Sequence, residues 1–136
     1  MSVVPMLTYA DGPSAMDWLA EAFGFVEQTR WLDDDGRVAH GEMRAGDGLV
    51  MIASTNADYE GPTAHRQHCE QADRWLRSPY VVNGVLVYVD DIDAHFARAR
   101  AAGAPTLSEV EEGGPGRLYR TEDLEGNRWM FLQPGG

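Results

Sequence analysis

Two segments of the chain repeat each other at a distance of 79 residues, and no gap is needed between Leu7 and Gly24. The identical residues are Leu7, Tyr9, Asp11, Ala15, Ala20, Ala22 and Gly24 in the first segment, and Leu86, Tyr88, Asp90, Ala94, Ala99, Ala101 and Gly103 in the second. A duplicated pattern indicates two copies of one supersecondary unit. The fold is therefore expected to have two similar halves.

Each repeat begins with a strand that turns into a helix. Short apolar runs bounded by turn residues, at 6–10 and 85–89, are typical of buried strands. Ser14 is expected to cap the first helix, and Asp93 or Asp91 the second. Gly24 and Gly103 follow the apolar helical pattern, where a left-handed residue ends a helix.

Beyond the helices the repeat continues with an offset of 80 residues, so that Gly36 and Gly46 fall on Gly116 and Gly126. About three strands of hairpin length are expected in each unit, at 26–33, 37–44 and 48–54, and at 105–111, 117–122 and 128–133. The sequence therefore predicts an α+β fold, in which a single domain (1–136) contains two tandem βαβββ units at 3–55 and 84–134.

A connecting segment at 56–83 has no counterpart in the repeat. A helix is expected at 64–76, after the turn at Gly61 and before Pro79. So long a connection is typical of a lid, a dimer element or a flexible linker.

The charge balance argues against several partners. Lysine and arginine number 11 against 22 acidic residues, and the net charge of −11 would repel nucleic acid. No apolar run reaches the about 20 residues that span a bilayer, and no secretory signal precedes the first strand. Cys69 is the only cysteine, which excludes an intrachain disulfide. A cytoplasmic protein that binds neither membrane nor nucleic acid is expected.

Five stretches carry a resemblance to a known family: 7–11, 22–25, 35–40, 85–91 and 122–129. With the two βαβββ units, they resemble the vicinal oxygen chelate superfamily of glyoxalases, bleomycin-resistance proteins and extradiol dioxygenases. The strand that contains His40 is similar to the uncharacterised glyoxalase-like branch. The turn before the last strand resembles the family's pattern, except that Leu124 replaces the usual proline.

The resemblance implies curved mixed sheets around a cavity. In metalloenzymes of the superfamily, the first and fourth strands of each unit supply histidine or glutamate ligands to a divalent ion. Here these positions fall on Val4, on 49–53, on Asn83 or Gly84, and on Met130, none of which is a histidine or a carboxylate. We therefore expect neither a metal nor another cofactor.

Side chains for a cavity can still be proposed. His40 and Glu42 alternate along one strand and face the same way, and His40 falls on Arg120 in the repeat. They position a polar ligand or perform acid–base chemistry, unless they form an ordinary strand pair. The candidate ligand-binding residues are Met6, Thr8, Trp31, His40, Glu42, Ile52, Arg120, Met130 and Leu132.

The leading functional hypothesis is metal-free binding of a largely apolar or aromatic metabolite or antibiotic, because an apolar cavity with few polar groups suits reversible binding. The alternative is a lyase, isomerase or dioxygenase-type enzyme that uses His40 or a non-standard metal site, for which His65, His68, Cys69 and Glu70 are the nearby ligand types. A homodimer is expected, because proteins of this superfamily commonly complete their cavities with a partner's sheet.

Overall fold

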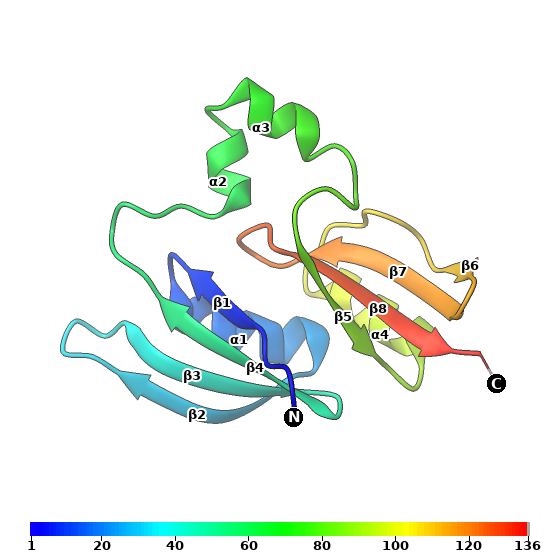
Figure 1. Ribbon diagram of the computed structural model, residues 1–136, viewed down its shortest axis with the longest axis horizontal. Coiled ribbons are helices and arrows are strands. Elements are labelled where there is room, and N and C mark those ends of the chain that lie inside the picture. Colours follow the sequence, from blue (N-terminus) through cyan, green and yellow to red (C-terminus); the bar gives the residue numbers. More distant parts are fainter. Residues whose placement is uncertain (136) are drawn as a thin grey trace.

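The computed structural model describes residues 1–135 and contains two four-stranded mixed sheets beside one another (Figure 1). The first unit contains β1 (Met6–Tyr9), α1 (Gly12–Phe23), β2 (Val26–Leu32), β3 (Val38–Ala45) and β4 (Gly48–Ser54). The connection contains α2 (Pro62–Arg66) and α3 (Glu70–Trp75). The second unit contains β5 (Gly84–Tyr88), α4 (Ile92–Ala101), β6 (Glu111–Gly113), β7 (Gly116–Glu122) and β8 (Arg128–Pro134).

The strand orders, β1-β4-β3-β2 and β5-β8-β7-β6, confirm the predicted pair of βαβββ units. In each sheet the first and last strands of the unit pair in parallel, and the other pairings are antiparallel. Over the described residues neither sheet closes into a barrel. Within residues 1–135, no helix is long and apolar enough to cross a membrane.

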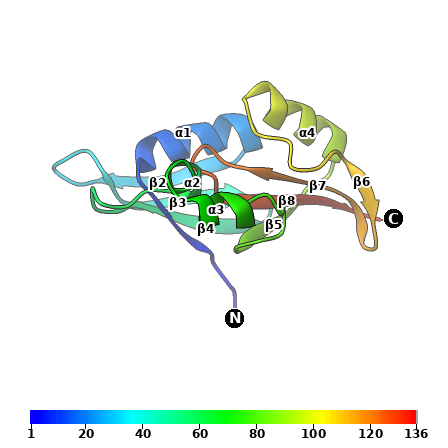
Figure 2. The ribbon, with the colours of Figure 1, turned by 90° about the horizontal axis from the view of Figure 1, so that it is seen from above.

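The helices α1 and α4 lie on the same side of the strand layer (Figure 2). Between helices and strands lies one hydrophobic cluster that includes residues of both units. Phe23 of α1 packs edge-on against Phe131 of β8, with ring centroids 4.7 Å apart. The opposite side of each sheet faces away from both helices, and we call these two surfaces the first and second open faces.

The helix caps correct part of the sequence interpretation. Asp11, not Ser14, caps α1: its Oδ1 accepts a hydrogen bond from the Ser14 backbone N–H at 3.1 Å. The Ser14 hydroxyl donates to the same carboxylate, so its side chain supports the cap. Asp91 caps α4, as one of the two alternatives predicted. Gly24 ends α1 with a φ of 73°, the left-handed conformation expected of it.

The caps also shift the repeat by one residue at the start of each unit, because Asp11 and Asp91 are 80 residues apart. The offset of 79 placed Tyr88 on Tyr9, yet Tyr9 is fully buried and Tyr88 is 62% exposed. The two tyrosines therefore face opposite sides of their sheets. One residue of slip reverses the direction of every side chain in a strand, and this reversal matters for the site.

Two predicted elements are wrong in detail. The helix expected at 64–76 is broken at 67–69 into α2 and α3. The break brings the Arg66 Nε within 2.9 Å of the Asp73 Oδ1, whereas residues seven apart in one helix lie about 10 Å apart along its axis. The strand expected at 105–111 is reduced to an isolated bridge at Thr106, followed by β6. Proline at 105 offers no backbone N–H, and its carbonyl accepts instead from the Thr121 hydroxyl.

The turn between β7 and β8 joins the two units through one buried carboxylate. The Tyr9 hydroxyl donates to the Asp123 Oδ2 at 2.6 Å, and the Trp129 Nε1 donates to the same oxygen at 3.0 Å. The other oxygen accepts from the backbone N–H groups of Glu125 and Asn127. Burial raises the pKa of Asp123, and these hydrogen bonds act against the shift.

The same turn contacts the first unit at a second point. The Glu125 carboxylate accepts hydrogen bonds from the backbone N–H groups of Ala10 and Asp11, at 2.7 and 2.9 Å. These two residues lead from β1 into α1, and the turn therefore fixes where the first helix begins.

The helices are joined through His95 of α4. Its Nε2 lies 2.9 Å from the Phe23 carbonyl, which can only accept, so this nitrogen carries the proton. The Nδ1 then accepts from the Tyr119 hydroxyl at 2.7 Å. Burial lowers the pKa of His95, which keeps the ring neutral.

We expect Tyr9→Phe to lower the free energy of unfolding by about 1–3 kcal/mol, because a buried carboxylate oxygen loses a donor. Urea denaturation of the variant and of wild type measures the difference. Tyr88→Phe is the matched control, since the Tyr88 ring is largely exposed. An equal and small effect of both substitutions would contradict the role of the Tyr9–Asp123 hydrogen bond.

We also expect the protein to lose stability as the pH falls below about 6.5, where the unfolded chain protonates His95 and the folded chain resists protonation. The slope has an upper limit of about 1.4 kcal/mol per pH unit for one proton. Comparison with His95→Gln, by urea denaturation between about pH 7.5 and 5.5, isolates this group from the buried carboxylates. Parallel pH profiles would show that His95 does not contribute.

Candidate functional site

The first open face consists of alternate residues of its strands. Leu7, Tyr9 and Ile52 point into the core, and their neighbours in sequence therefore point away from α1. Met51 pairs with Met6 on one side and with Glu42 on the other, which makes these side chains a continuous row. Met6 is 80% exposed and marks the outer side of this row.

A polar pair and an aromatic ring adjoin this row. The His40 Nε2 lies 3.1 Å from the Glu42 Oε2, and both side chains are half-buried. The Trp31 ring is tilted over the His40 ring with centroids 5.3 Å apart, and Trp31 is 66% exposed. The structure thus brings together five of the predicted site residues: Met6, Thr8, Trp31, His40 and Glu42.

Ile52 is placed elsewhere: it is 1% exposed and belongs to the core cluster under α1. Its pairing with Leu7 sets this direction, and Met51 takes the position on the open face. Sequence reasoning missed Met51. The alternation along β4 could have found it, because Val50 and Ile52 continue the apolar face that packs against α1.

The second open face contains the remaining predicted residues. Met130 pairs with Leu86 of β5 and with Arg120 of β7, and Arg120 is half-buried. Leu132 lies two residues along β8 and pairs with Leu118, but both of these leucines are buried. Leu86 and Tyr88 are exposed on the same face, although the sequence analysis did not select them.

The register changes which residue corresponds to Arg120. Glu42 pairs with Met51 as Arg120 pairs with Met130, so Glu42 is its equivalent in the first sheet. The predicted equivalence of His40 and Arg120 is therefore wrong. The two units place opposite charges at matching positions of their open faces.

A cavity of about 190 Å³ lies on the second open face, beneath the end of the connection. Its lining includes Pro79, Tyr80, Val82, Leu86, Arg120 and Met130. Val82 has a φ of 59°, which is uncommon for a β-branched residue and marks a strained turn into β5. A second cavity, of about 220 Å³, lies between β1 and β5 and is lined by Met6, Thr8, Tyr59 and Asn83 among others.

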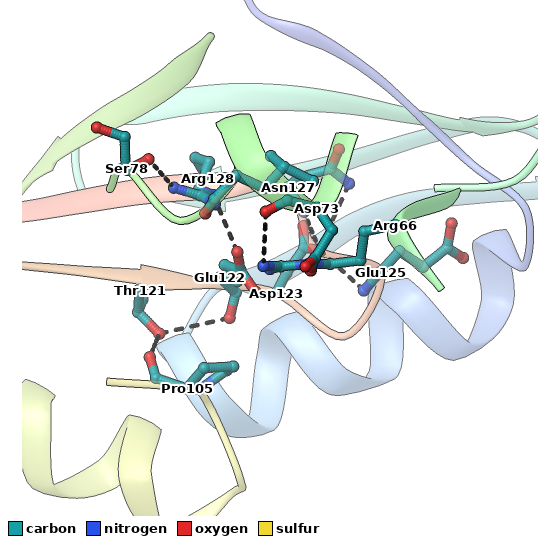
Figure 3. A network of polar contacts seen from close by, with 11 residues as sticks. Arg66, Asp73, Ser78, Pro105, Thr121, Glu122, Asp123, Glu125, Asn127 and Arg128 are labelled. Atoms are coloured by element: carbon teal, nitrogen blue, oxygen red, sulfur yellow. Dashed lines mark hydrogen bonds and ion pairs between the residues drawn. The ribbon is translucent and has the colours of Figure 1, made fainter. Parts of the chain in front are cut away.

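The connection is fastened over the second sheet by Arg128 (Figure 3). Its Nη atoms donate to the carbonyls of Leu76 and Ser78 at 2.5 and 2.9 Å. Its Nε lies 2.9 Å from the Glu122 Oε2 without the alignment of a hydrogen bond. Burial raises the pKa of Glu122, and the charge of Arg128 opposes this shift. The pair holds residues 76–78 in place and consumes the Arg128 charge.

The residues present do not fit a divalent metal. Methionine and leucine side chains at the centre of the open faces offer no imidazole nitrogen or carboxylate oxygen. Across residues 1–135, no three histidine, cysteine, aspartate or glutamate side chains gather as a metal site. In the connection, His68 contacts Glu60, and the break between α2 and α3 disrupts the helix face that His65 and Cys69 would share.

The arrangement therefore offers two apolar surfaces, each with one or two polar groups. Exposed Met, Trp, Leu and Tyr side chains provide contact area, and His40 with Glu42 or Arg120 provides direction. Such a composition is typical of a site that binds a small molecule.

Known proteins share this architecture. An uncharacterized protein of Mycobacterium bovis is 31% identical over 135 residues, which cover 96% of this chain and 81% of that protein. The crystal structure of TioX from Micromonospora sp. ML1 is 31% identical with a TM-score of 0.71, and the match covers 100% of this chain and 98% of TioX. A bleomycin-binding protein from Streptomyces verticillus has a TM-score of 0.61 at 22% identity, with 99% and 97% of the chains covered.

A family profile matches the chain over residues 3–131, nearly its whole length. The two βαβββ units, their strand order and the full-length relatives agree with that match. The chain belongs to the glyoxalase/bleomycin resistance protein/dioxygenase superfamily.

Proposed function

We propose that the protein reversibly binds a largely apolar or aromatic small molecule, a metabolite or an antibiotic, on the open faces of its sheets and without a metal or cofactor. The observation that carries the proposal is the exposure of Met6, Trp31, Leu86 and Tyr88 on the side away from the helices. Large apolar side chains that are exposed together mark a surface for a ligand or a partner. A cytoplasmic location remains a prediction.

Two solved structures support this reading by analogy. The Streptomyces verticillus protein was crystallised with copper(II)-bleomycin, and TnmS3 from Streptomyces sp. CB03234 is described as an antibiotic binding protein. Their identities of 22% and 20% support a shared fold. The binding function is inferred here from the open faces, because one fold can serve many functions.

We also propose a homodimer, in which a second copy covers the open faces. Within one chain the two sheets lie side by side and do not enclose a common cavity (Figure 2). A symmetric contact would bury the exposed apolar side chains of both copies at once.

A second candidate function is acid–base catalysis by His40. The His40 Nε2 lies 3.1 Å from the Glu42 carboxylate, which can orient the imidazole as a general base. An enzyme would convert a ligand into product, whereas a binding protein would return it unchanged. Analysis of bound ligands after incubation separates the two.

We expect a thermal-shift screen of aromatic and polyketide-like compounds to yield ligands whose affinity falls by about 1–2 kcal/mol in His40→Ala, through loss of one hydrogen bond. His68→Ala is the matched control, because His68 lies in the connection. Binding should survive EDTA, and elemental analysis should find no stoichiometric metal.

Equal affinity of every identified ligand for His40→Ala and wild type would remove His40 from the site. Trp31 fluorescence provides a second readout, because the ring lies against His40. A chelator that abolishes binding would overturn the metal-free proposal.

For the dimer, light scattering at micromolar concentration should give twice the chain mass. Met6→Glu should shift the population to monomer, because a charge on the apolar face must be desolvated at the interface. Leu124→Glu, at the exposed tip of the β7–β8 turn, should leave the dimer intact. A wild-type monomer would contradict the proposal.

A further inference from the structure

The cavity beneath residues 79–82 has an unusual charge environment. Five arginines contact carboxylates within 4 Å: Arg30, Arg66, Arg77, Arg117 and Arg128. Arg120 lines the cavity and is half-buried, yet its guanidinium has no hydrogen-bond or ion-pair partner in the described chain. This is notable in a protein with 22 acidic and 11 basic side chains.

The nearest potential partners of Arg120 are already engaged. Glu122 faces the same way two residues along β7, but its carboxylate lies against Arg128. Arg128 in turn donates to the Leu76 and Ser78 carbonyls. These two charges cancel, and the cavity wall keeps the positive charge of Arg120.

The rest of the wall is suited to an aromatic ring. Leu86 and Met130 flank one another beside Arg120, and Pro79 and Val82 close the side toward the connection. Tyr80 lines the cavity while 75% of its surface remains exposed, which leaves its ring free to pack against a ligand. An apolar cavity of about 150 Å³ suffices for benzene, and this cavity has about 190 Å³.

We propose that the cavity binds the ring of an aromatic carboxylic acid and that Arg120 holds its carboxylate. The inference rests on the proposed function and narrows its ligand class. A guanidinium matches a carboxylate with two parallel N–H donors, and partial burial strengthens the pairing. Arg120 then determines specificity, and the apolar wall supplies most of the contact area.

The test uses 2-naphthoate and its neutral isostere 2-naphthamide, titrated calorimetrically into the full-length protein. We expect wild type to bind naphthoate about tenfold more tightly than the amide, as a charged hydrogen bond implies. Arg120→Gln should abolish that preference and leave naphthamide binding unchanged, which also shows that the variant is folded. Arg120→Lys should retain part of the preference.

Arg37→Gln is the matched control, since Arg37 lies exposed in the β2–β3 turn and the substitution changes the net charge equally. It should leave both affinities unchanged. Equal binding of both probes by wild type, a preference that persists in Arg120→Gln, or its loss in Arg37→Gln would each overturn the inference.

Failure of wild type to bind either naphthyl probe would also overturn it. The proposed function would survive that result if the compound screen still yields ligands that depend on His40. It would fail separately if the screen yields no ligand, and the two failures are therefore distinguishable.

Discussion

The buried Asp123 carboxylate is the interaction on which the arrangement of the two units depends. It accepts from Tyr9 of the first unit and from Trp129 of the second, which are otherwise far apart in the sequence. The turn that holds it also places the start of α1 through Glu125, and it supports α2 because the Thr63 N–H donates to the Glu125 carbonyl. A single tight turn thus sets the position of three segments, and an unpartnered charge there would be costly.

Placement of both helices on one side gives the molecule its functional asymmetry. The helical side is filled by aromatic packing around Phe23 and Phe131, while the other side keeps methionine, tryptophan and tyrosine exposed. Strand alternation converts this division into a rule for each residue: odd and even positions serve stability and recognition, respectively, or the reverse. The two faces are not equivalent, since Glu42 and Arg120 occupy matching positions with opposite charge.

Much of the fold could be predicted from the repeat, because periodicity and turn residues are local signals. The direction of individual side chains was harder, since a one-residue insertion between β1 and β5 is hidden by identical residues at an offset of 79. Ile52 illustrates the result: it is apolar like its neighbour Met51, and only the pairing with Leu7 shows which of the two faces outward. Contacts between residues distant in sequence, such as Tyr9 with Asp123 or Arg128 with Leu76, leave no local pattern to read.

The turn between β7 and β8 also determines how the protein can be divided. If the chain were cut within the connection at 56–83, one fragment would carry Tyr9 and the other Asp123 and the turn. Each fragment alone would leave part of the shared aromatic cluster in water, and the second would also leave its buried acceptor without the Tyr9 donor. The halves are thus complementary pieces that recover their structure by reassociation, in the manner of a split reporter. Gene duplication has here produced two units that no longer function as independent modules.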